Sequence, residues 1–305
     1  MDLVYLIISD CLLILIGWLL HNKWHFSGEF FTGLEKLVYF LLFPALMIRS
    51  LTLSPISLSS AGNLLIISFL LSFAGLWMGS QVKRFFPVEA KSLASSIQCA
   101  YRFNTFMGLS LASAIAGKES FLVMTVLVGF CVPIMNVLAV NTLAKHQNNS
   151  NVLLEILKNP LVISTFIGLT LNFSGWSIPD PFAGTLEKLS QGTISLGLMC
   201  VGAALMLRSG AQNIQLLSWI VCVRLLVMPI VGIVLALLFQ LSAVSAQTLV
   251  LFTSLPTASA AYILAVRMGG DGRTVASIIS VGTMFAMLTM PMWMSLAAWL
   301  FPLGQ

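Results

Sequence analysis

Two short polar segments interrupt otherwise apolar stretches of the chain, and their side chains are suited to binding a ligand. Residues 101–105 read YRFNT, and residues 253–257 read TSLPT. Guanidinium, amide and hydroxyl groups donate hydrogen bonds to anions, whereas a proline leaves a backbone carbonyl without its helical partner. The sequence presents no nucleophile paired with a base and no metal-ligand cluster. The pattern therefore favours noncovalent binding over catalysis, and an enzyme is the least favoured class.

The elements that hold these segments must be membrane-spanning helices. Apolar residues make up 58% of the 305 residues, charged residues make up 8%, and the mean hydropathy is +0.99. A helix needs about 20 apolar residues to cross ~30 Å of hydrocarbon, where its backbone must be hydrogen-bonded internally. We therefore predict an all-α integral membrane protein with about ten spans, at residues 3–21, 34–53, 61–82, 90–115, 120–144, 156–173, 185–207, 213–239, 245–267 and 273–301.

The basic residues predict the orientation of these spans. When the connections alternate between the two membrane faces, ten basic residues fall on one face, and only Arg49, Lys118 and Lys188 fall on the other. The positive-inside rule then places both termini outside the cytoplasm, in what we expect to be a bacterial inner membrane. Orientation thus explains the net charge of +5, so that no nucleic-acid partner is implied.

The sequence also indicates an internal duplication. The tetrapeptide LEKL at residues 34–37 recurs at residues 186–189, 152 positions later, and the polar segment 145–151 (KHQNNSN) separates five predicted spans from five more. We predict one repeat at residues 1–149 and a second at residues 150–305. Because five is odd, the second repeat enters the membrane from the opposite face, and inverted repeats are typical of secondary transporters. A duplicated channel or inert scaffold is the alternative.

This register places Asn104-Thr105 in the fourth span opposite Pro256-Thr257 in the ninth. Helices that break at matching positions of two halves point to a binding site near the membrane midplane. We predict that Asn104, Thr105, Pro256 and Thr257 shape this site and that Asn136, in the fifth span, forms a side wall. A proline kink and an ordinary polar contact between packed helices are the competing interpretation.

Three ionisable residues lie inside the predicted spans, where a charge is costly and a functional or paired role is the default expectation. Arg102 binds an anionic substrate or pairs with Asp10. Arg224 anchors the structure or attracts the anion. Asp10 carries a coupling proton or forms a fixed salt bridge with Arg102 or with Arg224. The five cysteines lie in predicted spans without CxxC spacing, so we expect neither a metal nor another cofactor.

Several short motifs, in their order and spacing, resemble one family of membrane proteins. They are Leu34 to Leu37 with the segment FPAL at residues 43–46, Asn104-Thr105 with Gly108, Leu255-Pro256, and Val281 to Thr283 with Met290-Pro291. Over essentially the whole chain the sequence resembles the auxin efflux carrier family, which includes plant PIN-type carriers and bacterial carriers linked to malonate and similar acids.

The resemblance implies a ten-helix, inverted-repeat fold akin to the bile-acid sodium symporters. Spans 1, 2, 6 and 7 would form a scaffold domain, and spans 3–5 and 8–10 would form a transport domain. The substrate would bind where the fourth and ninth spans cross, the transport domain would move like an elevator, and the protein would form a homodimer through its scaffold. Phe103 and Ser110 stand where the family often has prolines, so we expect the first crossover to be less sharply broken than the second.

Three functions fit these patterns. The leading hypothesis is a secondary carrier that moves a small organic anion, a mono- or dicarboxylate, across the lipid bilayer. Arg102 adds a charge that is absent from the plant carriers, so auxin is not inferred as the substrate. The second hypothesis is a sodium-coupled symporter of the bile-acid type, in which the same crossovers coordinate sodium; a proton is the other candidate coupling ion. The third is a channel or receptor without active transport.

Overall fold

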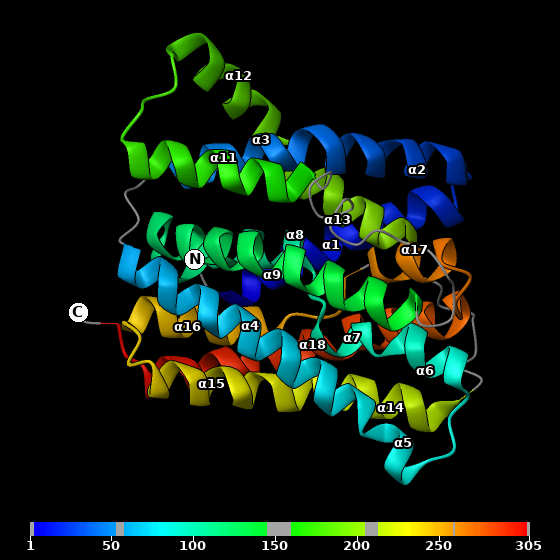
Figure 1. Ribbon diagram of the computed structural model, residues 1–305. Coiled ribbons are helices and arrows are strands. Elements are labelled where there is room, and N and C mark those ends of the chain that lie inside the picture. Colours follow the sequence, from blue (N-terminus) through cyan, green and yellow to red (C-terminus); the bar gives the residue numbers. More distant parts are fainter. Residues whose placement is uncertain (1–2, 53–57, 145–159, 205–212, 259, 304–305) are drawn as a thin grey trace.

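Every described secondary-structure element of the chain is a helix. The structure, a computed structural model, describes residues 3–52, 58–144, 160–204, 213–258 and 260–303, and these form a bundle of nearly parallel and antiparallel helices (Figure 1). The predicted linker at residues 145–151 lies outside these ranges.

The helices group into ten consecutive segments that match the ten predicted ranges to within about six residues at either end. The first five are α1 (Leu3–Asn22); α2, η1 and α3 (Gly28–Leu37, Val38–Leu42, Phe43–Thr52); α4 and α5 (Leu58–Ser80, Val82–Phe85); α6, α7 and α8 (Ala90–Ser96, Gln98–Tyr101, Thr105–Ala116); and α9 (Lys118–Ala144). The second five are α11 (Pro160–Ser174); α12 and α13 (Asp180–Gln191, Thr193–Ala204); α14, η2 and α15 (Ile214–Cys222, Val223–Val227, Met228–Leu238); α16 and α17 (Ala243–Ser254, Ala260–Arg267); and α18 (Gly272–Leu300).

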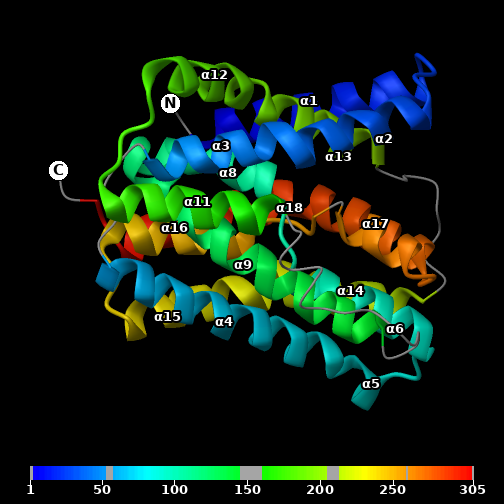
Figure 2. The same cartoon turned by 45° about the horizontal axis from the view of Figure 1, so that its top comes forward.

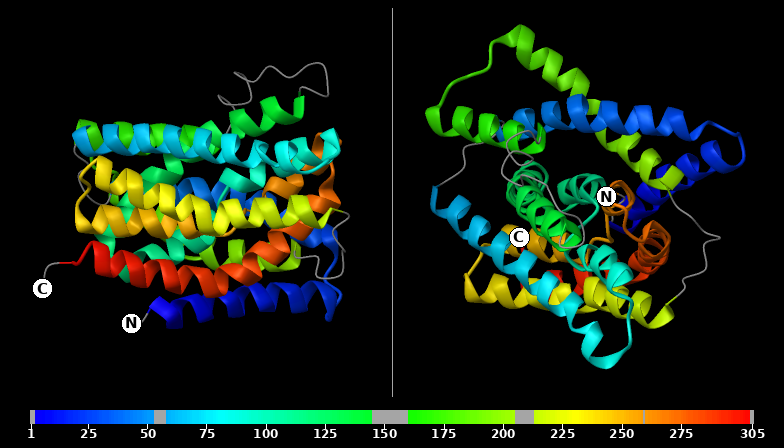
Figure 3. Two further views of the ribbon diagram at one scale, coloured as in Figure 1. Left: turned by 90° about the horizontal axis from the view of Figure 1, so that it is seen from below. Right: turned by 45° about the vertical axis from the view of Figure 1, so that its right-hand side comes forward.

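Five of these segments are individually long and apolar enough to cross a membrane as continuous helices: Gly28–Thr52, Gly62–Phe85, Lys118–Leu143, Ile214–Leu238 and Gly272–Leu300. Successive segments run in alternating directions, so that α1 begins and α18 ends at the same end of the bundle (Figures 1 and 3). The all-α membrane fold is thereby confirmed. The exact inverted repeat and its orientation relative to the cytoplasm stay predictions.

The helices pack in two groups. In the first, α1 lies along α13, and α3 lies along α11 and α12; in the second, α4 packs on α9, and α16 packs on α15 and α18. Figure 2 shows α1, α2, α3, α12 and α13 along one edge of the bundle, with α4, α5 and α15 along the opposite edge. The scaffold and transport sets that the family resemblance implies stay predictions.

Two glycines allow α1 and α13 to touch through their backbones. A Cβ on Gly17 would overlap the carbonyl oxygen of Met199, and a Cβ on Gly202 would overlap the carbonyl oxygen of Ile14. Small residues that let two helix backbones approach are a common basis of helix association in membranes.

We expect Gly17→Leu to destabilise the protein by about 3 kcal/mol or more, at the upper end of overpacking costs, because the obstructing atoms of Met199 belong to the backbone. The thermal unfolding midpoint in detergent measures this effect. Gly62→Leu is the matched control, since a Cβ there meets nothing within 4 Å. Equal midpoints for the two variants would show that α1 and α13 can separate without cost.

Gly75 and Gly79 allow α4 to pack closely against α7. A Cβ on Gly75 would lie 2.7 Å from Tyr101 Cβ, and a Cβ on Gly79 would lie 2.9 Å from Ala100 Cβ. Because both contacts are with α7, these glycines hold α4 against the short helix that leads into the first polar segment.

Asp271 ties the start of α18 to α6. Its backbone N–H donates to Ser95 Oγ at 2.8 Å, and its carboxylate accepts from Ser92 Oγ at 2.7 Å and Thr274 Oγ1 at 2.6 Å. The Thr274 N–H also donates to Oδ1 at 3.0 Å, so Asp271 caps α18. Partial burial raises the pKa of the carboxyl group, but the hydrogen bonds, with Lys91, outweigh burial and hold the pKa below its usual 3.8.

We expect Asp271→Asn to lower the unfolding midpoint at neutral pH, because the amide replaces an accepting oxygen with a donor. A depressed folded-state pKa means that ionised Asp271 stabilises the protein above the unfolded-state pKa of about 3.9, and that this stabilisation disappears as the pH falls through the folded-state value. The midpoint difference from wild type should therefore be constant between about pH 7 and 5 and shrink below about pH 4. Asp180→Asn, at the exposed start of α12, is the control. A difference that persists unchanged to about pH 3 would contradict the assignment.

Candidate functional site

The first polar segment is a complete break in the fourth span. Helix α7 ends at Tyr101, Arg102 takes an extended conformation with φ −73° and ψ 142°, and α8 begins at Thr105. Asn104 starts the new helix, because its side-chain oxygen accepts a hydrogen bond from the Met107 N–H at 3.2 Å. The expectation of a less sharply broken first crossover is therefore wrong: the helix is fully interrupted at residues 102–104 without the missing prolines, and Asn104 caps the start of α8.

The second polar segment breaks the ninth span, and here a proline is the cause. Helix α16 ends at Ser254, Leu255 is extended with φ −60° and ψ 145°, and α17 begins at Ala260. The ring of Pro256 disfavours the helical conformation of the residue before it, which explains the extended Leu255. The backbone N–H that proline lacks would otherwise have bonded to the carbonyl of Phe252, four residues earlier.

The two breaks contact each other. The Asn104 N–H donates to the Pro256 carbonyl at 2.8 Å, and the Thr257 hydroxyl donates to the Cys99 carbonyl at 2.8 Å. Beside these bonds the rings of Phe103 and Phe252 lie 4.1 Å apart between centroids. Backbone groups that lose their helical hydrogen bonds in one span are thus hydrogen-bonded by the other span. The two residue pairs that the 152-residue register aligned lie side by side at this crossing.

Gly108 allows the two spans to come this close. A Cβ at this position would lie 2.7 Å from Leu255 Cδ1 and 3.3 Å from Met124 Sδ. Its place one turn into α8 therefore leaves room for the side chain of the opposite break.

Arg224 is buried beside the second break, with 2% of its surface exposed. Its Nε donates to the Leu255 carbonyl at 2.7 Å, and its Nη2 donates to the Phe252 carbonyl at 3.1 Å. The guanidinium group therefore satisfies the carbonyl that Pro256 orphans. A positive charge at the C-terminal end of α16 also complements the helix dipole.

Arg102 follows the C-terminal end of α7 and is half-buried. Its Nη1 donates a long hydrogen bond of 3.4 Å to Gln98 Oε1. Within the described part of the chain, no carboxylate lies within 4.0 Å of either Arg102 or Arg224. The ion pair among the described residues lies elsewhere, between α3 and α12, where Arg49 Nε is 2.7 Å from Glu187 Oε2. The side chain of Asp10 lies outside the described side chains, so its predicted pairing with either arginine is untested.

The remaining predicted residues differ in how the structure places them. The amide nitrogen of Asn104 is buried and has no hydrogen-bond partner among the described residues. Thr105 is half-buried at the start of α8. Asn136 is half-buried in α9, and the described hydrogen bonds do not join it to either break. Of the six predicted site residues, five therefore lie at the crossing, and Asn136 stays a prediction.

The crossing faces the other group of helices. Phe106, in the first turn of α8, packs edge-on against Phe43 of α3 with ring centroids 5.3 Å apart, and its ring occupies the space that a side chain at Gly197 of α13 would fill. The half-buried side chains at the start of α8 thus lie at the boundary between the two groups.

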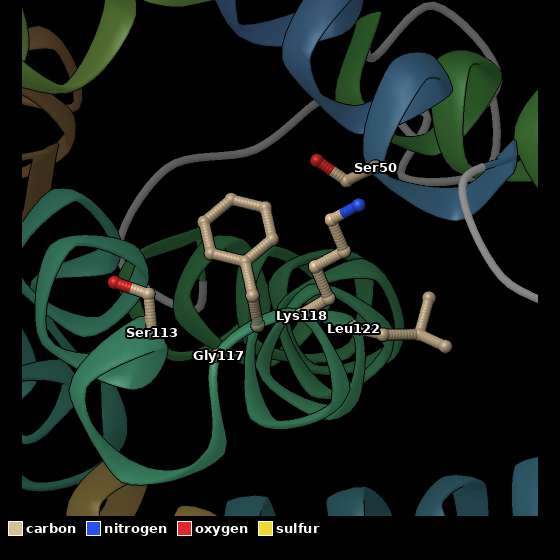
Figure 4. A pocket seen from close by; sticks show the side chains of 6 residues that line it. Ser50, Ser113, Gly117, Lys118 and Leu122 are labelled. Carbon is tan, nitrogen blue, oxygen red and sulfur yellow. The ribbon is translucent and has the colours of Figure 1, made fainter.

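A cavity of about 240 Å³ opens along the same boundary, at the end of the bundle where α8 turns into α9. It is lined by Ser50 of α3, Ser113 of α8, Gly117 of the turn, and Lys118, Phe121 and Leu122 of α9. Figure 4 shows the Lys118 side chain extending toward Ser50 across this space. The lining does not include residues of either break, so the cavity is adjacent to the α8–α9 turn and separate from the crossing.

Several known proteins are similar to this chain in sequence. Residues 145–294 match the sequence model of a family described as "Membrane transport protein". This match supports the resemblance to the auxin efflux carrier family. A protein of Methanothermobacter thermautotrophicus named "Uncharacterized transporter" is 22% identical over 295 residues, which cover 94% of this chain and 96% of the relative. A protein of Rhizobium meliloti named "Putative malonate transporter" is 23% identical over 299 residues, which cover 91% of this chain and 90% of the relative. The chain is thus a membrane transport protein.

Sequence reasoning missed two groups at the site. Gln98 is fully buried and accepts from Arg102; its position four residues earlier in the same span was the available signal, because residues at i and i+4 share a helix face. The orphaned carbonyl of Phe252 was also identifiable, since it precedes Pro256 by four residues.

Proposed function

We propose that this membrane protein is a secondary carrier for a small organic anion, a mono- or dicarboxylate, and that the anion binds at the crossing of the fourth and ninth spans. The single observation that carries the proposal is Arg102, a half-buried guanidinium group inside a span with one long hydrogen bond and no described carboxylate nearby. A charge at that depth needs a partner. A carboxylate matches the planar fork of the guanidinium group.

Two further groups favour an anion at this place. The N-terminal end of α8 carries a partial positive charge and begins at the crossing. The buried amide nitrogen of Asn104, which has no described partner, is a donor that a carboxylate oxygen would satisfy. The Rhizobium relative is named for malonate, a dicarboxylate, which supports the same substrate class.

The mode of transport that we propose is elevator-like alternating access. Support comes from the packing of the helices in two groups and from the cavity between α3 and the α8–α9 turn, which lies on the boundary where such groups would slide. The surplus of basic residues at one end of the bundle supports a bacterial inner membrane with both termini outside the cytoplasm.

Thermal stabilisation of the purified protein tests the binding step. A panel of malonate, other mono- and dicarboxylates and matched uncharged amides should separate into acids that raise the unfolding midpoint and amides that do not. The absence of a midpoint shift with every acid, at concentrations up to tens of millimolar, would refute carboxylate binding.

A further inference from the structure

We propose that Arg224 is a tethered cation that permanently occupies the carbonyl groups of the ninth-span break, so that this crossing works without a bound sodium ion. The inference concerns the ion requirement of the site that the proposed function assigns, and it rests on contacts of Arg224 with Phe252 and Leu255.

The proline at position 256 creates the need for a donor. A carbonyl of an α-helix accepts from the N–H four residues later, so Pro256 leaves the Phe252 carbonyl without a helical partner. Inside a membrane such a group must be satisfied by a neighbour, an ion or water. Here the Arg224 Nη2 donates to the Phe252 carbonyl at 3.1 Å, and its Nε donates to the carbonyl of Leu255, in the break itself, at 2.7 Å.

The same protein solves an equivalent problem without charge. Pro229 orphans the Leu225 carbonyl in the same way, and the indole Nε1 of Trp293 donates to that carbonyl at 2.8 Å. A neutral donor is therefore sufficient to satisfy an orphaned carbonyl in this fold. A buried guanidinium at the ninth-span break adds something that the indole does not, namely a fixed positive charge.

The local fold aims this charge at the break. Arg224 lies in the π-helix η2 (Val223–Val227), a wider turn that is frequent at functional sites. The side chain is buried to 2% exposure, and no described carboxylate lies within 4.0 Å of it. Its charge is consequently compensated by carbonyl dipoles and by the C-terminal end of α16, which is the environment that unwound helices offer to a sodium ion.

A sodium ion and Arg224 would compete for this environment. Two of the freed carbonyl oxygens already accept from the guanidinium group, and a second positive charge beside it would be repelled strongly in a site from which water is excluded. The carboxylate substrate, in contrast, is attracted by the same fixed charge. Arg224 thus determines ion specificity at the crossing while it positions the break.

Ion-dependent unfolding of the protein without substrate tests this inference separately from the proposed function. The wild-type midpoint should be the same in sodium, potassium and choline chloride at equal ionic strength. Arg224→Gln, which keeps a neutral donor but loses the charge, should lower the midpoint, and sodium or low millimolar guanidinium should raise it again relative to choline. Arg224→Lys should behave as wild type toward sodium, and Arg84→Gln, exposed on α5, is the matched control.

Each of these outcomes supports or contradicts the role of Arg224 as a tethered cation. A wild-type midpoint that rises specifically with sodium would overturn the inference, and so would a folded Arg224→Gln variant that responds to no cation. If Arg224→Gln does not fold, the wild-type comparison and Arg224→Lys still decide it. A carboxylate that stabilises the wild type only in sodium would refute the tethered cation and leave anion transport standing, whereas a failure of every carboxylate with unchanged ion behaviour would refute the proposed function alone.

Discussion

Arg102→Ala is expected to weaken carboxylate binding by at least ~30-fold while it changes the unfolding midpoint little, because a charged hydrogen-bonded pair shielded from water is worth several kcal/mol to binding. The described structure gives the Arg102 side chain one long hydrogen bond, at 3.4 Å to Gln98, so the folded state loses little hydrogen bonding when the side chain is removed. Titration of the midpoint with malonate, or equilibrium binding of labelled malonate, measures the effect.

Two variants define the specificity of this result. Arg102→Lys retains the charge without the planar fork and should bind with intermediate affinity. Arg84→Ala removes an exposed arginine from α5 and should bind as wild type does. Equal affinity of wild type and a well-folded Arg102→Ala would remove Arg102 from the site.

Asn104→Asp is expected to abolish carboxylate binding and leave the cap of α8 intact. The aspartate keeps the oxygen that accepts from the Met107 N–H, and asparagine and aspartate are equally good at starting a helix. It also replaces the buried amide donor with a negative charge at the crossing, where a second carboxylate would be repelled. We expect at least ~100-fold weaker binding at neutral pH, measured by the same titration.

Asn104→Ser separates the charge from the lost donor. Serine also caps a helix but adds no charge, so binding should fall only partly. If Asn104→Asp and Asn104→Ser bind malonate equally well, the negative charge has no effect, and the amide of Asn104 does not face the anion.

The positions of the two breaks could be predicted from the sequence, because a proline or a capping polar residue inside an apolar span interrupts the backbone hydrogen bonds of the helix. Pro256 predicts its own break, and the repeat register places Asn104 opposite it. The hydrogen bond from the Asn104 N–H to the Pro256 carbonyl could not be predicted, since the register relates equivalent positions and does not say which backbones touch.

The partner of Arg224 was harder to predict than its depth. Sequence reasoning weighed Asp10 as a partner because opposite charges are the usual way to satisfy a buried arginine. The described hydrogen bonds of the Arg224 side chain are instead with the backbone carbonyls of Phe252 and Leu255. Carbonyls of this kind are recognised only by asking which of them lose their helical N–H partner at a break. The sharpness of the first break was also underestimated. Prolines were expected to be needed for a complete break, but the side-chain oxygen of Asn104 caps α8 in their place.

Counterflow in proteoliposomes tests the central claim most directly. Vesicles that contain the purified protein and are preloaded with unlabelled malonate, in choline-based buffer without sodium, should accumulate external radiolabelled malonate transiently above equilibrium. Vesicles with Arg102→Ala or with no protein should not. Transient accumulation that depends on Arg102 is the result we predict. No accumulation of malonate or of any other tested carboxylate by folded wild-type protein, in choline buffer or in sodium buffer, would contradict a carrier for small organic anions.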